Sequence, residues 1–371
     1  MQRRPARSGW RTRASRPQHV TVVALLRDRL GARLERWSGR PTLFAVAAMN
    51  AITGLGVAAV LAPVWFGVDV GTFRRCAQLA AEGRTDPCSF YTPMFALVAR
   101  PLTWVSPTMA ELAMVLIGIA ILLTGVKLET RGQAPVDRLL VAVATLGFAP
   151  VVSELILGQT TLLMAAALYP VARRTDALRS GILLGIVLAL APKPFLLPVL
   201  VWMIVWRRRA LAAALVAALA LTCLGLALMG PDPYRQWISL VMEVGQSGMS
   251  GSSLNLSLWA GGLDPMEVAL AAAIGAAALW AILRGSSPGF VAALFAGLLL
   301  APYSLLYAAS ILLLAVKPAL AFAPRATRVL ALTVNPALVL LVAPTAWLVG
   351  GLIACLPFAR PGKIRAPVGP T

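Results

Sequence analysis

Long apolar runs, separated by short polar or basic segments, are the main pattern of this sequence. The first run extends from Pro41 to Val68 without a charged residue. A helix of about 20 apolar residues is long enough to cross the hydrocarbon core of a bilayer. Four runs reach this length and predict full membrane-spanning helices at 43–66, 107–126, 210–229 and 266–283.

Several other apolar runs are shorter or are interrupted in the middle. Residues 139–152 and 160–172 are too short to span comfortably, and the sequence "APKP" divides the run 181–206. Basic residues flank the pair 139–172 at both ends, and they also flank the run 181–206 at both ends. This pattern places both ends of each region on the cytoplasmic side. Proline restricts the preceding residue and removes a backbone donor, so it favours a break between two short helices. The pattern therefore predicts helical hairpins whose tips lie within the membrane.

A third hairpin is predicted at 289–300 and 304–316, around the sequence "APYS". A last apolar run, 329–355, is broken at Pro336 and Pro344. Broken helices are tolerated in a membrane where the freed backbone groups are buried in protein or line a wet cavity. The breaks are therefore places to look for a site.

The composition agrees with this pattern. The 371 residues are 59% hydrophobic, with a mean hydropathy of +0.81, which is too apolar for a soluble domain. We expect an all-α polytopic integral membrane protein with about 9–11 membrane helices, several of them short or broken. The membrane domain is expected to cover residues 41–356.

The distribution of charge predicts the orientation. The net charge is +19, and 11 of the 33 basic residues are arginines among the first 40 residues. Most others form short clusters between apolar runs, which is typical of cytoplasmic loops beside anionic lipid and argues against nucleic acid as a partner. We expect residues 1–40 to form a basic cytoplasmic arm with an amphipathic helix over 20–37, and residues 357–371 a basic cytoplasmic tail. The segments 67–93 and 230–265 then form outer loops.

The cysteines and the single histidine narrow the chemistry further. Cys76 and Cys88 fall in the same predicted outer loop and can pair if that compartment is oxidising, whereas Cys223 and Cys355 lie in apolar runs. The one histidine, His19, lies in the basic arm, so the sequence contains no Cys/His cluster for zinc. We expect neither a metal nor a cofactor.

Asp69 is the first candidate for chemistry, because it lies where an uncharged span meets a predicted outer helix over 70–82. A catalytic carboxylate that faces membrane-embedded substrates would be placed here. An aspartate at this point also caps a helix that begins at Val70, which stabilises the helix by about 1 kcal/mol. The spacing alone does not separate these interpretations, and one side chain can serve both.

Lys193 is the only charged residue between Gly181 and Trp206. An ammonium group in hydrocarbon is costly, so an intramembrane lysine normally has a partner. Three possibilities remain open at this stage. The lysine binds a substrate phosphate, it pairs with a structural carboxylate such as Glu154, or it is exposed at the interface.

Polar residues also stand at the tips of the other two hairpins. Gln159 lies in "LGQTT", and Tyr303 and Tyr307 lie in "PYSLLY". Each of these sequences alone is also typical of a helix-breaking turn. Polar groups at membrane depth mark substrate paths, and three tips at similar depth favour a shared site.

The order of several motifs resembles the membrane glycosyltransferases of family 87, relatives of the polyprenyl-phosphate-mannose-dependent mannosyltransferases of actinobacteria. The motifs are "GVDVGTFRRCAQLAAEG", "FYTPMFALVARPLTWVSP", "LILGQTTLLMAAALYPVARR" and "SGILLGIVLALAPKPFLLPVLVWMIVWRRR". The later "GPDPYRQWISL", "NLSLWAG" and "LLLAPYSLLYAASILLL" also fit that layout. The resemblance covers residues from about 43 to 320, and the ordered set is more specific than any single motif.

This resemblance implies the C-type glycosyltransferase architecture and a polyprenyl-phosphate sugar as donor. By motif position, Asp69 is the expected catalytic base and Lys193 the expected residue beside the lipid phosphate. The chain departs from the family pattern at Leu306 and Ala308, where many members carry a histidine or a second acid. The candidate substrate-binding residues are Gln159, Glu154, Tyr91, Asn255, Tyr303 and Tyr307.

The prediction is a membrane glycosyltransferase that moves a hexose, with mannose as the first choice, to an envelope glycolipid or glycan on the outer face, with inversion. The expected location is a bacterial plasma membrane, with a cytoplasmic N-terminus. A transporter or flippase for a lipid-linked sugar is one alternative, since it would use Lys193 and the broken helices without needing Asp69. An inactive relative that acts as an assembly partner is another.

Overall fold

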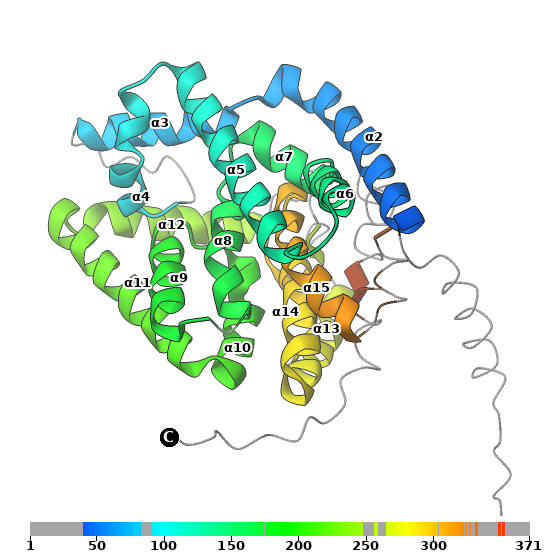
Figure 1. Ribbon diagram of the computed structural model, residues 1–371. Coiled ribbons are helices and arrows are strands. Elements are labelled where there is room, and N and C mark those ends of the chain that lie inside the picture. The colour runs from blue at the N-terminus through cyan, green and yellow to red at the C-terminus, as the bar shows by residue number, and fades with distance from the viewer. Residues whose placement is uncertain are drawn as a thin grey trace, which may run out of the picture. The chain divides into compact units, whose positions relative to one another are not determined.

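The computed structural model consists of α-helices joined by short turns and 3-10 helices, without strands in the part of the chain that it describes (Figure 1). The description below concerns the unit that begins at residue 39. The described residues are 40–82, 91–173, 175–247, 256–258, 265–302 and 304–322, with eight further positions between 324 and 352.

Among these residues, four helical segments are long and apolar enough to cross a membrane, and the number rises to five if one bent pair counts as a single span. The long helices are α2 (Arg40–Trp65), α5 (Pro107–Glu129), α11 (Arg208–Met229) and α13 (Pro265–Arg284). The first candidate span runs on from α2 into α3 (Val68–Ala81). The predicted all-α polytopic membrane fold is therefore confirmed, and the four predicted full spans correspond to these four helices.

The first predicted hairpin contains three helices rather than two. They are α6 (Pro135–Leu146), α7 (Ala149–Leu157) and α8 (Thr161–Ala172). The axes of α6 and α7 are bent by 61°. The bend packs on α2 with backbone against backbone, since a Cβ added at Gly147 would lie 2.6 Å from the Asn50 carbonyl. The turn that carries Gln159 joins α7 to α8.

The predicted break at "APKP" is confirmed. It separates α9 (Ala177–Leu190) from a 3-10 turn, η2 (Pro194–Leu196), which leads into α10 (Leu197–Trp206). Figure 1 shows α9 and α11 side by side. Gly181 and Gly185 allow this close approach, because a Cβ at either position would lie within 2.3 Å of a carbonyl oxygen of α11.

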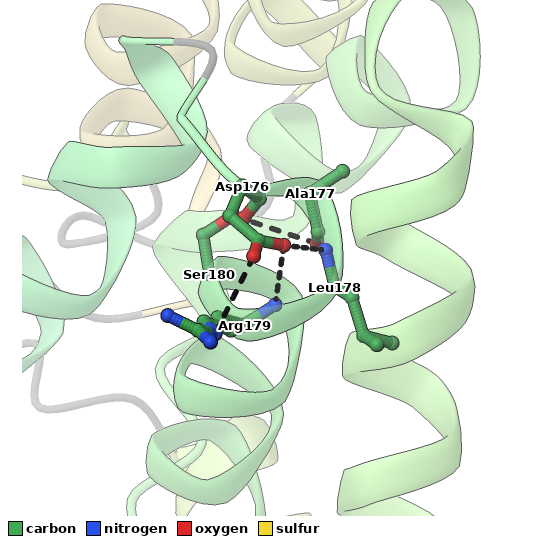
Figure 2. Close-up of polar contacts among 5 residues, drawn as sticks. All are labelled: Asp176, Ala177, Leu178, Arg179 and Ser180. Atoms are coloured by element: carbon green, nitrogen blue, oxygen red, sulfur yellow. Dashed lines mark hydrogen bonds and ion pairs between the residues drawn. The ribbon is translucent and has the colours of Figure 1, made fainter.

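The beginning of α9 is a self-contained cap (Figure 2). Asp176 accepts hydrogen bonds from the backbone N–H groups of Leu178 at 3.0 Å and Arg179 at 3.2 Å. The Asp176 carboxylate also pairs with the Arg179 side chain at 3.4 Å, and the Ser180 hydroxyl donates to the backbone carbonyl of Asp176. A capping aspartate of this kind satisfies amides that have no partner within the helix.

The core forms around α14 (Ser286–Leu300), in which every residue from 288 to 299 is buried. Two tryptophans of α10 bind the connection between α13 and α14. Trp202 donates to the Ser286 carbonyl at 2.8 Å, and Trp206 donates to the Ile282 carbonyl at 2.7 Å. The chain then continues through η4 (Leu306–Leu312) into α15 (Leu313–Phe322). The predicted third hairpin is therefore a buried helix followed by a tightly wound turn and a short helix.

The first outer segment, 67–93, contains α3, and α4 (Pro93–Val98) and η1 (Arg100–Thr103) lead from it to α5. The second segment contains α12 (Asp232–Ser247), a helix that the sequence pattern did not predict. Three residues further on, 256–258, are buried in the core.

Several predictions fall outside the described residues. Cys76 is buried in α3 and disulfide-bonded, but Cys88 is not described, so their pairing stays a prediction. The others are the amphipathic helix over 20–37, most of the broken run 329–355 and the tail 357–371.

Candidate functional site

The site begins where α3 meets the end of α7. Gly67 is the N-cap of α3 and has a φ of 69°, a left-handed conformation that favours glycine. Its N–H donates to the Ile156 carbonyl of α7 at 2.7 Å. Asp69 therefore lies in the first turn of α3 rather than at its cap, and the predicted capping role before Val70 is wrong. The helix begins two residues earlier than that role requires.

A second glycine secures the same contact from the other side. Gly158 ends α7 with a φ of 73°. A Cβ at this position would lie 2.2 Å from Cγ2 of Val70, so only glycine allows α3 to approach the end of α7 this closely. The next residue is Gln159, which is thereby held opposite Asp69.

The Gln159 side chain connects the two charged candidates. Its Nε2 donates a short hydrogen bond to Oδ2 of Asp69. Its Oε1 accepts from the Tyr91 hydroxyl at 2.7 Å and from Nζ of Lys193 at 3.4 Å. Four predicted residues from four separate segments are thus joined through one amide.

Lys193 lies between two aromatic rings. Its Nζ is 4.7 Å from the ring centroid of Tyr91 and 5.7 Å from that of Tyr307, and it donates to the Tyr91 hydroxyl at 3.1 Å. The faces of aromatic rings attract cations, so this environment stabilises the ammonium group. Tyr307 comes from η4, and both tyrosines are largely buried, with exposed fractions of 8% for Tyr91 and 7% for Tyr307.

The turn that carries Lys193 is fixed on both sides. Thr92 binds the end of α9, since its hydroxyl donates to the Ala189 carbonyl at 2.7 Å and its N–H donates to the Leu190 carbonyl at 3.2 Å. On the other side, a Cβ at Gly297 would lie 1.9 Å from the Phe195 carbonyl oxygen. The turn therefore packs directly on the backbone of α14.

Glu154 is buried beside this network, with 1% of its surface exposed. Its Oε1 accepts from the Leu162 N–H at 2.9 Å, so the carboxyl closes the turn between α7 and α8. Among the contacts described for the two residues, there is no ion pair between Glu154 and Lys193. Lys193 and the buried Glu154 interact electrostatically at longer range, without a direct ion pair.

Two candidate residues, Asn255 and Tyr303, lie outside the described residues. Their chain neighbours are joined, because the N–H of Leu256 donates to the Ser304 carbonyl at 2.6 Å. The Ser257 hydroxyl also donates to the Ala301 carbonyl at 2.5 Å. The second outer segment is therefore anchored beside the break between α14 and η4.

The sequence reasoning missed Thr160, which is buried and lies 3.1 Å from the Tyr91 hydroxyl, atom Oγ1 to OH. Its place beside Gln159 in "LGQTT" was the available signal. Asp69, Gln159 and Lys193 are only partly buried, unlike the tyrosines behind them. The site therefore presents an anion, a neutral amide and a cation to an incoming molecule.

The fold and this site define a polytopic membrane protein with a polar site at the breaks of its helices. A family model described as Glycosyltransferase family 87 matches residues 90–313. The chain belongs to glycosyltransferase family 87, as the sequence resemblance predicted, and it is a membrane glycosyltransferase. The matched stretch contains Gln159 and Lys193, whereas Asp69 precedes it. No curated protein and no solved structure matches the chain.

Proposed function

We propose that this glycosyltransferase moves a hexose, mannose in the first instance, from a polyprenyl-phosphate sugar to a glycolipid or glycan of the cell envelope. Asp69 acts as the general base, and Lys193 binds the phosphate of the donor. The observation that carries this proposal is the shared contact with Gln159, which holds an anion and a cation at the two ends of one amide.

The chemistry needs only these two charges. Asp69 takes the proton of the acceptor hydroxyl while that oxygen attacks the anomeric carbon, and the bond from this carbon to the phosphate oxygen breaks. Attack from the face opposite the phosphate inverts the configuration. The phosphate is a weakly basic leaving group, so it needs no general acid. Lys193 stabilises the negative charge that the phosphate gains.

The donor class follows from where the cation lies. A compact ammonium binds a phosphate well as a point charge. Lys193 lies within an apolar run of 26 residues, and a cation in such a run supports a phosphate carried by a lipid over a water-soluble nucleotide sugar. The rings of Tyr91 and Tyr307 lie beside the Lys193 ammonium group. We propose that Glu154, Asn255 and Tyr303 are further substrate-binding residues.

We place the reaction on the outer face of a bacterial plasma membrane, with the N-terminus in the cytoplasm. The basic clusters support this orientation, because cytoplasmic loops are enriched in Lys and Arg. The disulfide of Cys76 also fits an oxidising compartment on the side of α3.

Replacement of Asp69 by Asn tests the proposal. Purified protein in liposomes is incubated with a labelled polyprenyl-phosphate hexose and an envelope lipid extract, and the glycosylated product is measured. Loss of a general base should lower the rate of transfer by about 10²- to 10⁴-fold. The matched control is Asp137→Asn, which removes only a surface pair with Arg40 and should retain activity.

Full transfer by the Asp69→Asn variant would overturn the role of Asp69. Movement of labelled lipid across the liposome membrane, without a new glycosidic bond, would instead indicate the transporter alternative.

Replacement of Lys193 by Met tests the phosphate contact. A charge-assisted hydrogen bond contributes about 1.5–3 kcal/mol, so the KM for the donor should rise by about 10- to 100-fold. The control is Lys127→Met, because Lys127 is an exposed lysine of α5. An unchanged KM for the donor would show that Lys193 does not bind the phosphate.

A further inference from the structure

The amide of Gln159 lies between the base and the cation, in the path along which their charges would otherwise interact. An amide group is polar in a fixed sense, because its NH₂ donates and its C=O accepts. Here the NH₂ is directed at Asp69 and the C=O at Tyr91 and Lys193. The two ends of this side chain therefore report on two different parts of the proposed reaction.

The order of donors runs one way through the network. Lys193 donates to the Tyr91 hydroxyl, and that hydroxyl donates to Oε1 of Gln159. Nε2 of Gln159 then donates to Asp69. In such a chain each hydrogen bond polarises the next, so a change at the first donor alters the last acceptor.

The fold of this turn does not depend on the Gln159 side chain. The backbone N–H groups of Gly158 and Gln159 donate to the Glu154 carbonyl at 3.0 and 3.1 Å. The buried Glu154 carboxyl closes the other side of the turn by accepting from Leu162. The side-chain amide is therefore available for a role in the reaction.

We propose that Gln159 is a positioning residue that couples the donor-phosphate site at Lys193 to the orientation of Asp69 for proton transfer. This inference rests on the proposed function. A phosphate at Lys193 takes the N–H donors that now bind Tyr91 and Oε1 of Gln159. The Tyr91 hydroxyl still donates to Oε1 and Nε2 still donates to Asp69, so the amide keeps the carboxylate in a fixed direction beside the bound donor. Without this amide the base loses its direction toward the acceptor hydroxyl, and transfer slows.

Three variants separate the two ends of the amide. Gln159→Leu removes both ends, and Gln159→Glu keeps an acceptor for Lys193 and Tyr91 but has no N–H for Asp69. Tyr91→Phe removes the hydroxyl that joins Lys193 to the amide. Each variant is assayed for kcat and for the KM of a labelled polyprenyl-phosphate hexose in liposomes. Gln78→Leu is the control, since Gln78 is an exposed glutamine of the same helix as Asp69.

We expect Gln159→Leu to lower kcat by about 100-fold, as does the loss of one positioned donor, with the donor KM within about threefold of wild type. Gln159→Glu should lower kcat to a similar extent. The variant with both Gln159→Leu and Tyr91→Phe should be no slower than Gln159→Leu alone, because both changes interrupt the same chain of hydrogen bonds.

Multiplicative effects in the double variant, or wild-type kcat in Gln159→Glu, would overturn the coupling. The Asp69→Asn variant keeps this failure distinct from a failure of the proposed function. If Asp69→Asn is inactive while Gln159→Glu is fully active, Asp69 is the base and the coupling is wrong. If Asp69→Asn is fully active, the proposed role of Asp69 is itself wrong. Since Gln159→Glu is nearly isosteric, it keeps the test valid where Gln159→Leu fails to fold.

Discussion

Asp176 and Asp69 each stand at the beginning of a helix, and their surroundings are opposite in kind. Asp176 begins α9, and its carboxylate contacts lie within residues 176–180 (Figure 2). Asp69 lies in the first turn of α3, and its carboxylate accepts from Gln159, which is 90 residues away in the sequence. The side chain of the first satisfies its own helix, whereas that of the second faces another part of the molecule.

The contrast separates an aspartate that stabilises from one that is suited to react. The oxygens of a capping aspartate already accept hydrogen bonds from backbone amides, so few lone pairs remain for a substrate. Asp69 leaves the cap position to Gly67, and no side-chain cap closes this end of α3 within the described contacts. Its carboxylate accepts from the neutral amide of Gln159, which leaves lone pairs for a substrate hydroxyl.

The largest expected difference concerns the position of the carboxylate. Asp69→Glu keeps the charge but moves it by one methylene, and misplacement by about 1 Å lowers a catalysed rate by about 100-fold. Asp176→Glu makes the same change at the cap and should leave the transfer rate within about twofold of wild type. Initial rates of hexose transfer measure both. Equal rates for the two variants would remove the distinction between the two aspartates.

A smaller effect is expected at the glycines that have left-handed conformations. Gly158→Ala and Gly132→Ala should both lower the free energy of unfolding by about 1–2 kcal/mol, because both residues have a positive φ that alanine adopts only with strain. Only at Gly158 would the new Cβ collide with Val70, whereas nothing lies within 4 Å at Gly132. The collision should cost about 1–3 kcal/mol more and should also displace Gln159 from Asp69.

Thermal unfolding in detergent and the transfer rate measure this difference. Equal loss of stability in the two glycine variants would contradict the close packing of α3 on the end of α7.

The smallest expected effect is on stability at the two aspartates themselves. Asp176→Ala should lower the free energy of unfolding by about 1 kcal/mol, because two backbone amides lose their acceptor. Asp69→Ala should change it by less than about 0.5 kcal/mol. A denaturation series on both variants in the same detergent compares them. A greater loss at Asp69 would indicate that its main role is structural.

The membrane helices could be predicted because their signal is local. Length and uninterrupted apolar character suffice for α2, α5, α11 and α13, and prolines suffice for the break at Lys193. The helix α12 was missed although Tyr234, Trp237, Ile238 and Val241 follow helical spacing, because the outer segment around it is rich in glycine and serine and reads as a loop. The bend between α6 and α7 was missed although Gly147 and Pro150 mark it in the sequence, and its packing on α2 could not be predicted from the hairpin alone.

The site was predictable as a set of residues but not as an arrangement. Asp69 and Lys193 stand out because each is a lone charge at the edge or in the middle of an apolar run. The bridging role of Gln159 depends on which rotamers meet across four segments, and this is set by tertiary packing. The capping role of Asp69 was predicted wrongly, because α3 begins at Val68 and not at Val70.

The seam between α9 and α11 bears on how the proposed lipid donor would be admitted. Carbonyl oxygens of one helix lie against glycines of the other, so neither can slide or roll without a collision. Lys193, which follows the end of α9, is therefore supported by a rigid pair of helices. We therefore expect any movement that admits the proposed lipid donor to occur outside this seam.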